Sequence, residues 1–290
     1  MKIEFYGVRG SMPTPGQDTV LFGGNTSCVY VELENGDGVI LDAGTGIVNL
    51  GKKLINQQSA ITILLTHNHW DHIQGFPYFV PIYQKSRSIT LIPGAIEHTD
   101  KDMVLKQMSG STHPVKFDQL PANIQLNKTL ATQAQFTINE FLVKTQKLNH
   151  PDGGTAYCLY GDGKKLAYVT DNELNPPSNI VTSWQQWLAF IADADVLIHD
   201  AQYTPEDMPT KHGWGHSTYN QVVKLALEAN VKQLFIISHD PARTDHELLT
   251  LETNIREECG LTLDFHCARE GILIDLSKAD LGNADLGKTE

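Results

Sequence analysis

The stretch that decides the fold reads Thr66-His67-Asn68-His69-Trp70-Asp71-His72. It follows an apolar run at 61–65, which is typical of a buried strand whose carboxyl end opens onto a site. Three imidazoles and a carboxylate within six residues are hard to explain by packing and indicate metal binding. His67 and His69 point the same way on an extended backbone, because side chains repeat with period 2. Asp71 and His72 follow where a turn can aim both at a second ion, so the stretch predicts two half-sites that need further ligands from elsewhere.

The composition limits the kinds of protein this chain can be. Its 290 residues, 41% of them hydrophobic, can bury a large core. A formal net charge of -12 repels polyanions and disfavours a long nucleic-acid substrate, although two metal ions would still attract a small phosphate ester. The four cysteines are scattered without a C-x-x-C pair, which favours reduced, buried thiols.

The two ends of the chain carry little targeting information. The N-terminus leads directly into a strand pattern at 2–7 without the apolar segment of a signal peptide. No apolar run approaches the ~18 residues of a membrane span. We therefore expect a cytoplasmic protein without a membrane partner, and a polar C-terminal tail at 276–290.

Strand and helix patterns alternate along 1–275 with no linker, which predicts a single domain. Strand patterns occupy 2–7, 28–33, 39–42, 61–65, 141–147, 155–160, 165–170, 196–198, 234–237 and two short segments in 261–275, whereas helical patterns occupy 47–56, 183–192, 217–229 and 244–258. Residues 73–130 are less regular. Within them, 97–109 has a helical pattern, and the aromatic segment 75–83 is predicted to be a loop that lines either a pocket or the core.

A positional regularity links these strands. His or Asp ends one apolar strand after another, at 67–72, 150, 171, 199–200 and 239. Strand ends that meet at one rim of a sandwich build a site from residues far apart in sequence, and the series predicts such a rim.

Together these motifs resemble the metallo-β-lactamase superfamily. The motif H-x-H-x-D-H stands at 67–72, the strand-Asp-Gly element is Leu41-Asp42-Ala43-Gly44, and the later single ligands correspond to His150, Asp171 and His239. The resemblance covers about 1–275 and implies an α/β fold, a four-layer αβ/βα sandwich of two packed mixed β-sheets flanked by helices, with a dinuclear metal site.

The resemblance also implies a ligand set. One ion would be held by His67, His69 and His150, the other by Asp71, His72 and His239, and Asp171 would bridge them. Asp42 would support the ligands from beneath without touching metal. No Cys is near Asp171, and all-nitrogen-and-oxygen ligation suits two Zn²⁺ ions while tolerating Mn²⁺ or Fe.

Two later elements resemble the RNase Z-like phosphodiesterases. Ile198-His199-Asp200-Ala201 is similar to their His-Glu-Ala-Thr element, with Asp in place of Glu, and Gly215-His216-Ser217-Thr218 is similar to their His-Ser-Thr element. The resemblance implies that Asp200 orients His216 against the scissile phosphate, where an imidazolium neutralises charge or protonates the leaving oxygen. The alternative is that His216 only caps the helix beginning near Ser217.

The substrate expected from this pattern is small. The resemblance implies a contrast here: RNase Z enzymes carry a long tRNA-binding arm, in many members between the third and fourth motifs. In this chain those motifs are His150 and Asp171, and only 20 residues separate them. Our hypothesis is a dinuclear phosphodiesterase acting on a small, cyclic phosphate diester such as a cyclic nucleotide or ribosyl cyclic phosphate. A bridging hydroxide, oriented by Asp71 and Asp171, would attack phosphorus.

Other functions remain open from the sequence. A hydrolase of carboxylic esters, lactones, lactams or thioesters would use the same metals without needing the Asp200–His216 pair. An RNase Z-like ribonuclease is a further alternative, and a non-catalytic nucleic-acid-binding protein is disfavoured by the negative charge. A homodimer is compatible with all of these.

Overall fold

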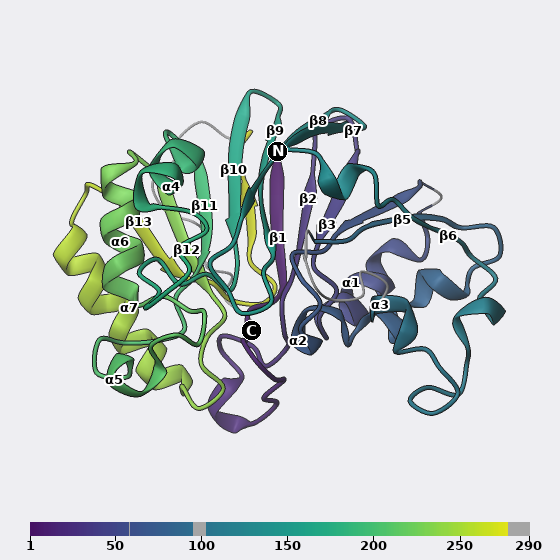
Figure 1. The fold of residues 1–290 in the computed structure, drawn as a ribbon, viewed down its shortest axis with the longest axis horizontal. Coiled ribbons are helices and arrows are strands. Elements are labelled where there is room, and N and C mark those ends of the chain that lie inside the picture. Colours follow the sequence, from purple (N-terminus) through teal and green to yellow (C-terminus); the bar gives the residue numbers. More distant parts are fainter. Residues whose placement is uncertain (58, 95–102, 278–290) are drawn as a thin grey trace, which may run out of the picture.

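A computed structural model describes residues 1–57, 59–94 and 103–277. Two mixed sheets pack face to face, in the strand orders β14-β1-β2-β3-β4-β5-β6 and β13-β12-β11-β10-β9-β8-β7, with helices on both outer faces (Figure 1). This arrangement confirms the predicted α/β class and the four-layer αβ/βα sandwich.

The strands and helices have the following bounds. The first sheet contains β1 (Lys2–Gly7), β2 (Cys28–Glu32), β3 (Gly38–Leu41), β4 (Ile61–Leu64), β5 (Ser88–Ile92), β6 (Asn123–Leu126) and β14 (Leu273–Asp275). The second contains β7 (Gln135–Ile138), β8 (Phe141–Lys147), β9 (Thr155–Gly161), β10 (Lys164–Val169), β11 (Val196–Asp200), β12 (Gln233–Ile237) and β13 (Asp264–Cys267). The helices are α1 (Ile47–Leu54), α2 (Trp70–Ile73), α3 (Met103–Lys106), α4 (Trp184–Ile191), α5 (Met208–Lys211), α6 (Tyr219–Glu228) and α7 (Asp245–Cys259).

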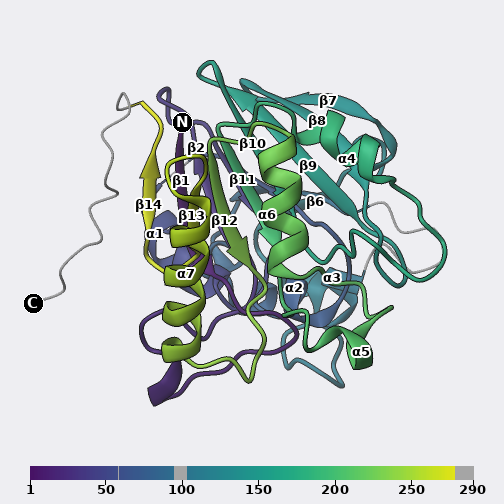
Figure 2. The ribbon, with the colours of Figure 1, turned by 90° about the vertical axis from the view of Figure 1, so that its left-hand side faces the viewer.

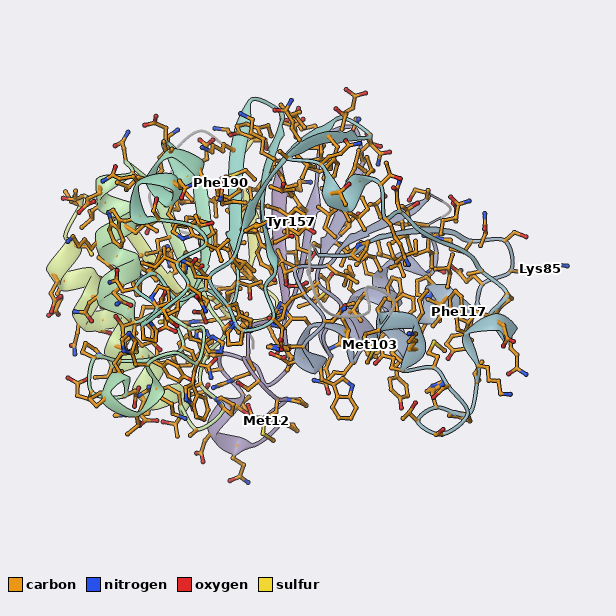
Figure 3. All side chains as sticks on the ribbon, in the orientation of Figure 1. Met12, Lys85, Met103, Phe117, Tyr157 and Phe190 are labelled. Atoms are coloured by element: carbon orange, nitrogen blue, oxygen red, sulfur yellow. The ribbon has the colours of Figure 1, made fainter. Side chains whose placement is uncertain are left out.

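Each inner strand divides its apolar side chains between two cores. In β12, Phe235 and Ile237 belong to the core between the sheets, whereas Leu234 and Ile236 belong to the core beneath α4, α6 and α7 (Figure 2). This follows from the period-2 alternation of a strand that is buried on both faces. Tyr157 of β9 lies in the centre of the molecule, between the sheets (Figure 3).

A Phe–Phe contact joins the two sheets and allows a test of this packing. The rings of Phe5 on β1 and Phe235 on β12 lie 5.5 Å apart, and Phe235 is 2% exposed. Phe235→Leu removes ring atoms that the surroundings cannot fully replace, and we expect it to lower the free energy of unfolding by about 1–3 kcal/mol. Denaturant unfolding measures this, with the exposed Leu261→Ala as a control expected to change stability little. An equal, negligible change in both variants would contradict a tightly packed interface between the sheets.

The less regular part of the sequence contains more structure than expected. The segment predicted as a loop at 75–83 forms two 3₁₀ helices, Phe76–Tyr78 and Val80–Tyr83, which bury Phe76 and Ile82 in the core beneath the first sheet. Strands β5, β6 and β7 and the one-turn helix α5 were not predicted, because segments of four or five residues carry little periodicity. Of the helix expected at 97–109, α3 covers 103–106, while 95–102 lie outside the described residues, as do 278–290 of the expected tail.

Parallel strand pairing brings the predicted site residues to one rim. Strands β10, β11 and β12 run parallel, as do β3 and β4, so the carboxyl ends of each set share an edge of their sheet. Helices α2 and α5 and the loop after β1 gather at this end of the sandwich, along the lower edge of Figures 1 and 2. None of the helices in the described part of the chain has the length and apolar character of a membrane span. The four cysteines are buried and unpaired, as predicted.

Candidate metal centre

Four side chains form a first cluster at the rim. They are His67, His69, His150 and Asp171, whose ligand atoms lie within 4.8 Å of one another. His150 Nε2 is 2.9 Å from His69 Nδ1, and His67 Nε2 is 3.5 Å from Asp171 Oδ2. The extended segment after β4 supplies the first two residues, and the loops after β8 and β10 supply the others. The first half-site predicted from the sequence is therefore assembled.

A second cluster shares one member with the first. Asp71, His72 and Asp171 have ligand atoms within 4.8 Å of one another, and His72 Nε2 lies 3.2 Å from Asp171 Oδ2 and 3.3 Å from Asp71 Oδ2. Asp71 and His72 belong to α2, the helical turn that directs both inward. The Asp171 carboxylate thus lies between the clusters, where the resemblance placed a bridging ligand.

The geometry and chemistry of these clusters fit divalent metal ions. A tetrahedral Zn²⁺ with bonds of about 2.0–2.1 Å holds its ligand atoms roughly 3.3 Å apart. Three separations in the clusters, of 2.9, 3.2 and 3.5 Å, lie near that spacing, and His150 Nε2 is 3.9 Å from Asp171 Oδ2. Within the described part of the chain, the buried His67 Nε2 has no hydrogen-bond partner, which is costly for a polar atom unless a bound ligand satisfies it. The residues present therefore form a binding site for divalent metal.

The surroundings favour protonation states that suit metal binding in His69, His150 and Asp171. Burial, together with the neighbouring His67, holds the pKa of His150 well below its usual value, and burial lowers the pKa of His69. Burial opposes ionisation of Asp171, but His72 and His216 hold the pKa of its carboxyl well below the usual range. Neutral imidazoles and an ionised carboxylate are the forms that coordinate metal. Burial acts to lower the pKa of His72, but Asp171 and Asp71 raise it well above the usual value, so this imidazole must release a proton when an ion binds.

Asp42 supports the cluster from beneath, as the sequence predicted. Its Oδ1 accepts a hydrogen bond from the Thr66 amide at 2.7 Å, and its Oδ2 accepts from His72 Nδ1 at 2.9 Å and from the Tyr168 hydroxyl at 3.0 Å. A proton fixed on Nδ1 of His72 leaves the Nε2 lone pair facing Asp71 and Asp171. Asp42 therefore selects the tautomer and orientation of this imidazole.

Asp42→Asn should weaken metal binding without removing a ligand. An amide cannot accept all the hydrogen bonds that both carboxylate oxygens accept, so the orientation of His72 loosens. We expect the dissociation constant of the bound metal to rise about 10- to 100-fold, measured by competition with a chromophoric chelator. A control is Asp37→Asn on the exposed turn after β2. Unchanged affinity in Asp42→Asn would contradict a supporting role for Asp42.

His239 is not part of either cluster. Its Nε2–H donates to the Ala268 carbonyl at 2.8 Å, and its Nδ1 is buried without a partner among the described residues. Burial lowers the pKa of His239 to about 3, so the imidazole is neutral with a free lone pair on Nδ1. Its role as the third ligand of the second ion stays a prediction, and the second cluster has two carboxylates and one imidazole without it.

Asp200 and His216 form the predicted pair beside the clusters. His216 Nδ1–H donates to Asp200 Oδ1 at 2.9 Å, and Asp200 Oδ2 accepts from the Ser217 amide at 2.9 Å. Burial acts to lower the pKa of His216, but the Asp200 carboxylate raises it to about 9. The ligand atoms of this pair and of Asp171 lie within 4.8 Å of one another, so an imidazolium stands next to the shared carboxylate.

The helix that follows does not use His216 as its cap. The Thr218 side chain accepts from the Gln221 amide and caps α6, while the Ser217 hydroxyl donates to the Asn172 carbonyl at 2.6 Å. The alternative in which His216 only caps this helix therefore finds no support in the contacts.

Two residues contribute to the site without a clear signal in the sequence. The Ser11 amide donates to Asp71 Oδ2 at 2.8 Å, which ties the loop after β1 to the second cluster. Glu173, 1% exposed, accepts hydrogen bonds from the amides of Gly213 and Gly215, both at 3.0 Å. The Gly215 carbonyl in turn accepts from His150 Nδ1 at 2.9 Å, so Glu173 holds the segment that orients a ligand.

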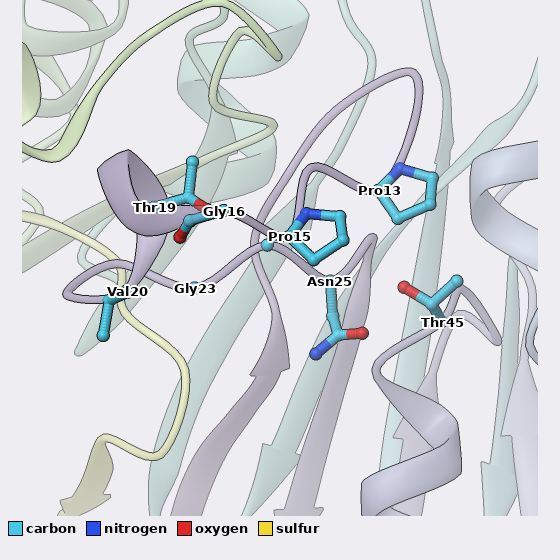
Figure 4. A pocket seen from close by; sticks show the side chains of 9 residues that line it. Pro13, Pro15, Gly16, Thr19, Val20, Gly23, Asn25 and Thr45 are labelled. Carbon is cyan, nitrogen blue, oxygen red and sulfur yellow. The ribbon is translucent and has the colours of Figure 1, made fainter.

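A cavity of about 330 Å³ lies within the loop after β1. Its lining includes Pro13, Thr19 and Asn25 from the loop and Thr45 from the segment before α1 (Figure 4). None of the clustered His and Asp residues lines it, although Ser11 of the same loop contacts Asp71. The loop thus joins a hollow on the surface to the edge of the metal centre.

The sandwich and its two clusters define the protein as a metal-dependent hydrolase of the metallo-β-lactamase fold, as the sequence predicted. Residues 38–239, more than half of the chain, match the family described as a beta-lactamase superfamily domain, and the chain belongs to this family.

Individual relatives agree with this placement. Ribonuclease Z of Picrophilus torridus is 24% identical over 96% of this chain and 96% of its own length. The metallo-beta-lactamase fold protein YhfI from Bacillus subtilis has a TM-score of 0.67 and 16% identity, covering 94% of this chain and 98% of its own. A diphosphatase from the PhnP family has a TM-score of 0.65 and 15% identity, covering 95% and 97%. These structures share the fold.

Proposed function

We propose that this protein is a dinuclear metal-dependent phosphodiesterase that hydrolyses a small, cyclic phosphate diester, such as a cyclic nucleotide or ribosyl cyclic phosphate. The observation that carries the proposal is the Asp200–His216 pair beside Asp171. Hydrolysis of a diester develops negative charge on phosphoryl oxygens and on a leaving alkoxide. A buried imidazolium can neutralise the first and protonate the second. A carboxylic ester, lactone, lactam or thioester hydrolase on this fold would not need that pair.

The two clusters would hold the metal ions. Zn²⁺ is our first choice, since imidazole and carboxylate ligands suit it, with Mn²⁺ or Fe as alternatives. When bound, two such ions lower the pKa of water toward neutrality and neutralise phosphoryl oxygens.

The chain's own residues then position the reacting groups. Asp71, whose Oδ2 is fixed by the Ser11 amide, and Asp171 present carboxylate oxygens that orient the attacking water. His216 keeps Nδ1–H on Asp200, which leaves Nε2–H to donate to a phosphoryl oxygen or to the leaving alkoxide. Asp200 thereby fixes both the charge and the tautomer of the acid.

An RNase Z-like ribonuclease is the second candidate. This candidate is supported by the similarity to the Picrophilus torridus protein named Ribonuclease Z, which covers almost the whole length of both chains. That relative also weighs against our expectation that no long nucleic acid is bound. The net charge of -12 argues against a long RNA substrate. The 20 residues between His150 and Asp171 are also too few to form a long RNA-binding arm at that place.

The proposal is tested by assaying the metal-loaded protein on bis-p-nitrophenyl phosphate, on cyclic nucleotides and on a precursor tRNA. We expect turnover of the small diesters with Zn²⁺, Mn²⁺ or Fe. Cleavage of the precursor tRNA with no turnover of cyclic substrates would favour the ribonuclease. No turnover of any phosphodiester with any of these metals would refute the proposal.

A further inference from the structure

Two exposed tryptophans flank the metal centre. Trp70 is 70% exposed and stands in sequence between His69 and Asp71, whereas Trp214 is 57% exposed and precedes Gly215. The segments that carry them meet through His150, whose Nε2 lies 2.9 Å from His69 Nδ1 and whose Nδ1–H donates to the Gly215 carbonyl. Large aromatic side chains left in water beside a reactive site are typical of a binding surface.

A lysine ammonium lies over the Trp214 ring. The Lys211 ammonium lies 4.1 Å from the centre of the Trp214 ring and 5.6 Å from that of Tyr203. The Tyr203 ring is in turn 5.5 Å from the ring of His216. Lys211 and the proposed acid His216 thus contact the same Tyr203 ring. An ammonium group there is complementary to an anionic substrate, in a chain whose net charge is -12.

The backbone around Trp214 is held from below. Glu173 is buried and accepts hydrogen bonds from the amides of Gly213 and Gly215, the residues on either side of Trp214. An exposed indole on an anchored backbone can bind a flat group at a small entropic cost, because little has to be ordered on binding.

We propose that Trp214, backed by Lys211, stacks an aromatic group of the substrate, so that the diester hydrolysed here is a nucleotide. This inference rests on the proposed phosphodiesterase function and names its substrate class. Stacking on an aromatic side chain tolerates every nucleobase, so the subsite selects a base without selecting its identity.

The test compares a nucleotide with a diester that lacks a base. The metal-loaded protein is assayed on adenosine 2′,3′-cyclic phosphate and on glycerol 1,2-cyclic phosphate. In Trp214→Ala we expect the ratio of the two KM values, nucleotide over glycerol ester, to rise about 5- to 100-fold, and in Trp214→Phe to rise far less. Leu261→Ala is the control: this side chain is fully exposed next to Gly260 at the end of α7 and should leave both KM values unchanged.

Binding without turnover gives an independent readout. Adenosine 5′-monophosphate should quench the tryptophan fluorescence of the metal-loaded protein, ribose 5-phosphate should not, and the quenching should diminish in Trp214→Phe. An unchanged KM ratio in Trp214→Ala, or undiminished quenching in Trp214→Phe, would overturn the inference. Turnover of the glycerol ester alone would overturn the nucleotide subsite and leave the phosphodiesterase standing, whereas turnover of neither diester, nor of bis-p-nitrophenyl phosphate, would remove the proposed function itself.

Discussion

Asp171→Ala should abolish stable binding of both metal ions and lower phosphodiester turnover by a factor on the order of 10⁴ or more. The single carboxylate oxygen Oδ2 lies 3.5 Å from His67 Nε2 and 3.2 Å from His72 Nε2, so its loss removes a ligand from each cluster at once. It also leaves three imidazoles of the first cluster without the negative charge that offsets a bound cation.

The measurement is the metal content of the purified variant after loading with Zn²⁺ and dialysis, together with its turnover of bis-p-nitrophenyl phosphate. Asp152→Asn provides a matched control, because Asp152 is an exposed carboxylate 4.0 Å from His69 Nε2 that belongs to neither cluster. Retention of two ions by Asp171→Ala would show that Asp171 does not bridge them.

His216→Ala should lower turnover by a factor of about 10²–10⁴ while leaving the metal content intact. The variant removes the proposed donor to the phosphoryl group. His216 comes within 4.8 Å of Asp171 and Asp200, but it belongs to neither of the two clusters assigned to the metal ions. His246→Ala, an exposed histidine on α7, is the control and should behave as the wild type. Loss of metal in His216→Ala would make this residue a ligand and would contradict its assignment as the acid.

The pair also predicts a pH dependence. The Asp200 carboxylate raises the pKa of His216 to about 9, so the cationic imidazole persists through neutral pH and is lost as the pH rises through that value. In Asp200→Asn this stabilisation of the cation is absent, and we expect the alkaline limb of the profile of kcat against pH to move to lower pH. An alkaline limb that does not move would show that His216 does not act as a cationic acid.

The sequence predicted most of the metal centre because two features fix the position of a ligand at a strand end: the periodicity of the strand and the pairing of parallel strands. His67 and Asp171 each follow an apolar strand, and parallel pairing brings such ends to one edge. The role of Asp42, which follows β3, came instead from the resemblance to the metallo-β-lactamase superfamily. These positions depend on strand periodicity and topology, which a sequence carries strongly.

What the sequence could not predict depends on side-chain rotation and on short irregular segments. His239 follows β12 as expected, but the direction of its ring, whose Nε2–H donates to the Ala268 carbonyl, depends on a rotamer that no periodicity encodes. Glu173 accepts from two backbone amides that lie 40 and 42 residues further along the chain, a contact without a residue-type pattern. Helix α5, which places Lys211 near Trp214, is a single turn.

The most direct test of the account is a titration of the metal-free protein with Zn²⁺ while the hydrolysis of bis-p-nitrophenyl phosphate is followed. Two clusters that share Asp171 predict that turnover rises until two equivalents of metal are bound per chain and then stays constant. Turnover that reaches its maximum at one equivalent, or metal binding at two equivalents with no hydrolysis of the diester, would contradict a dinuclear phosphodiesterase.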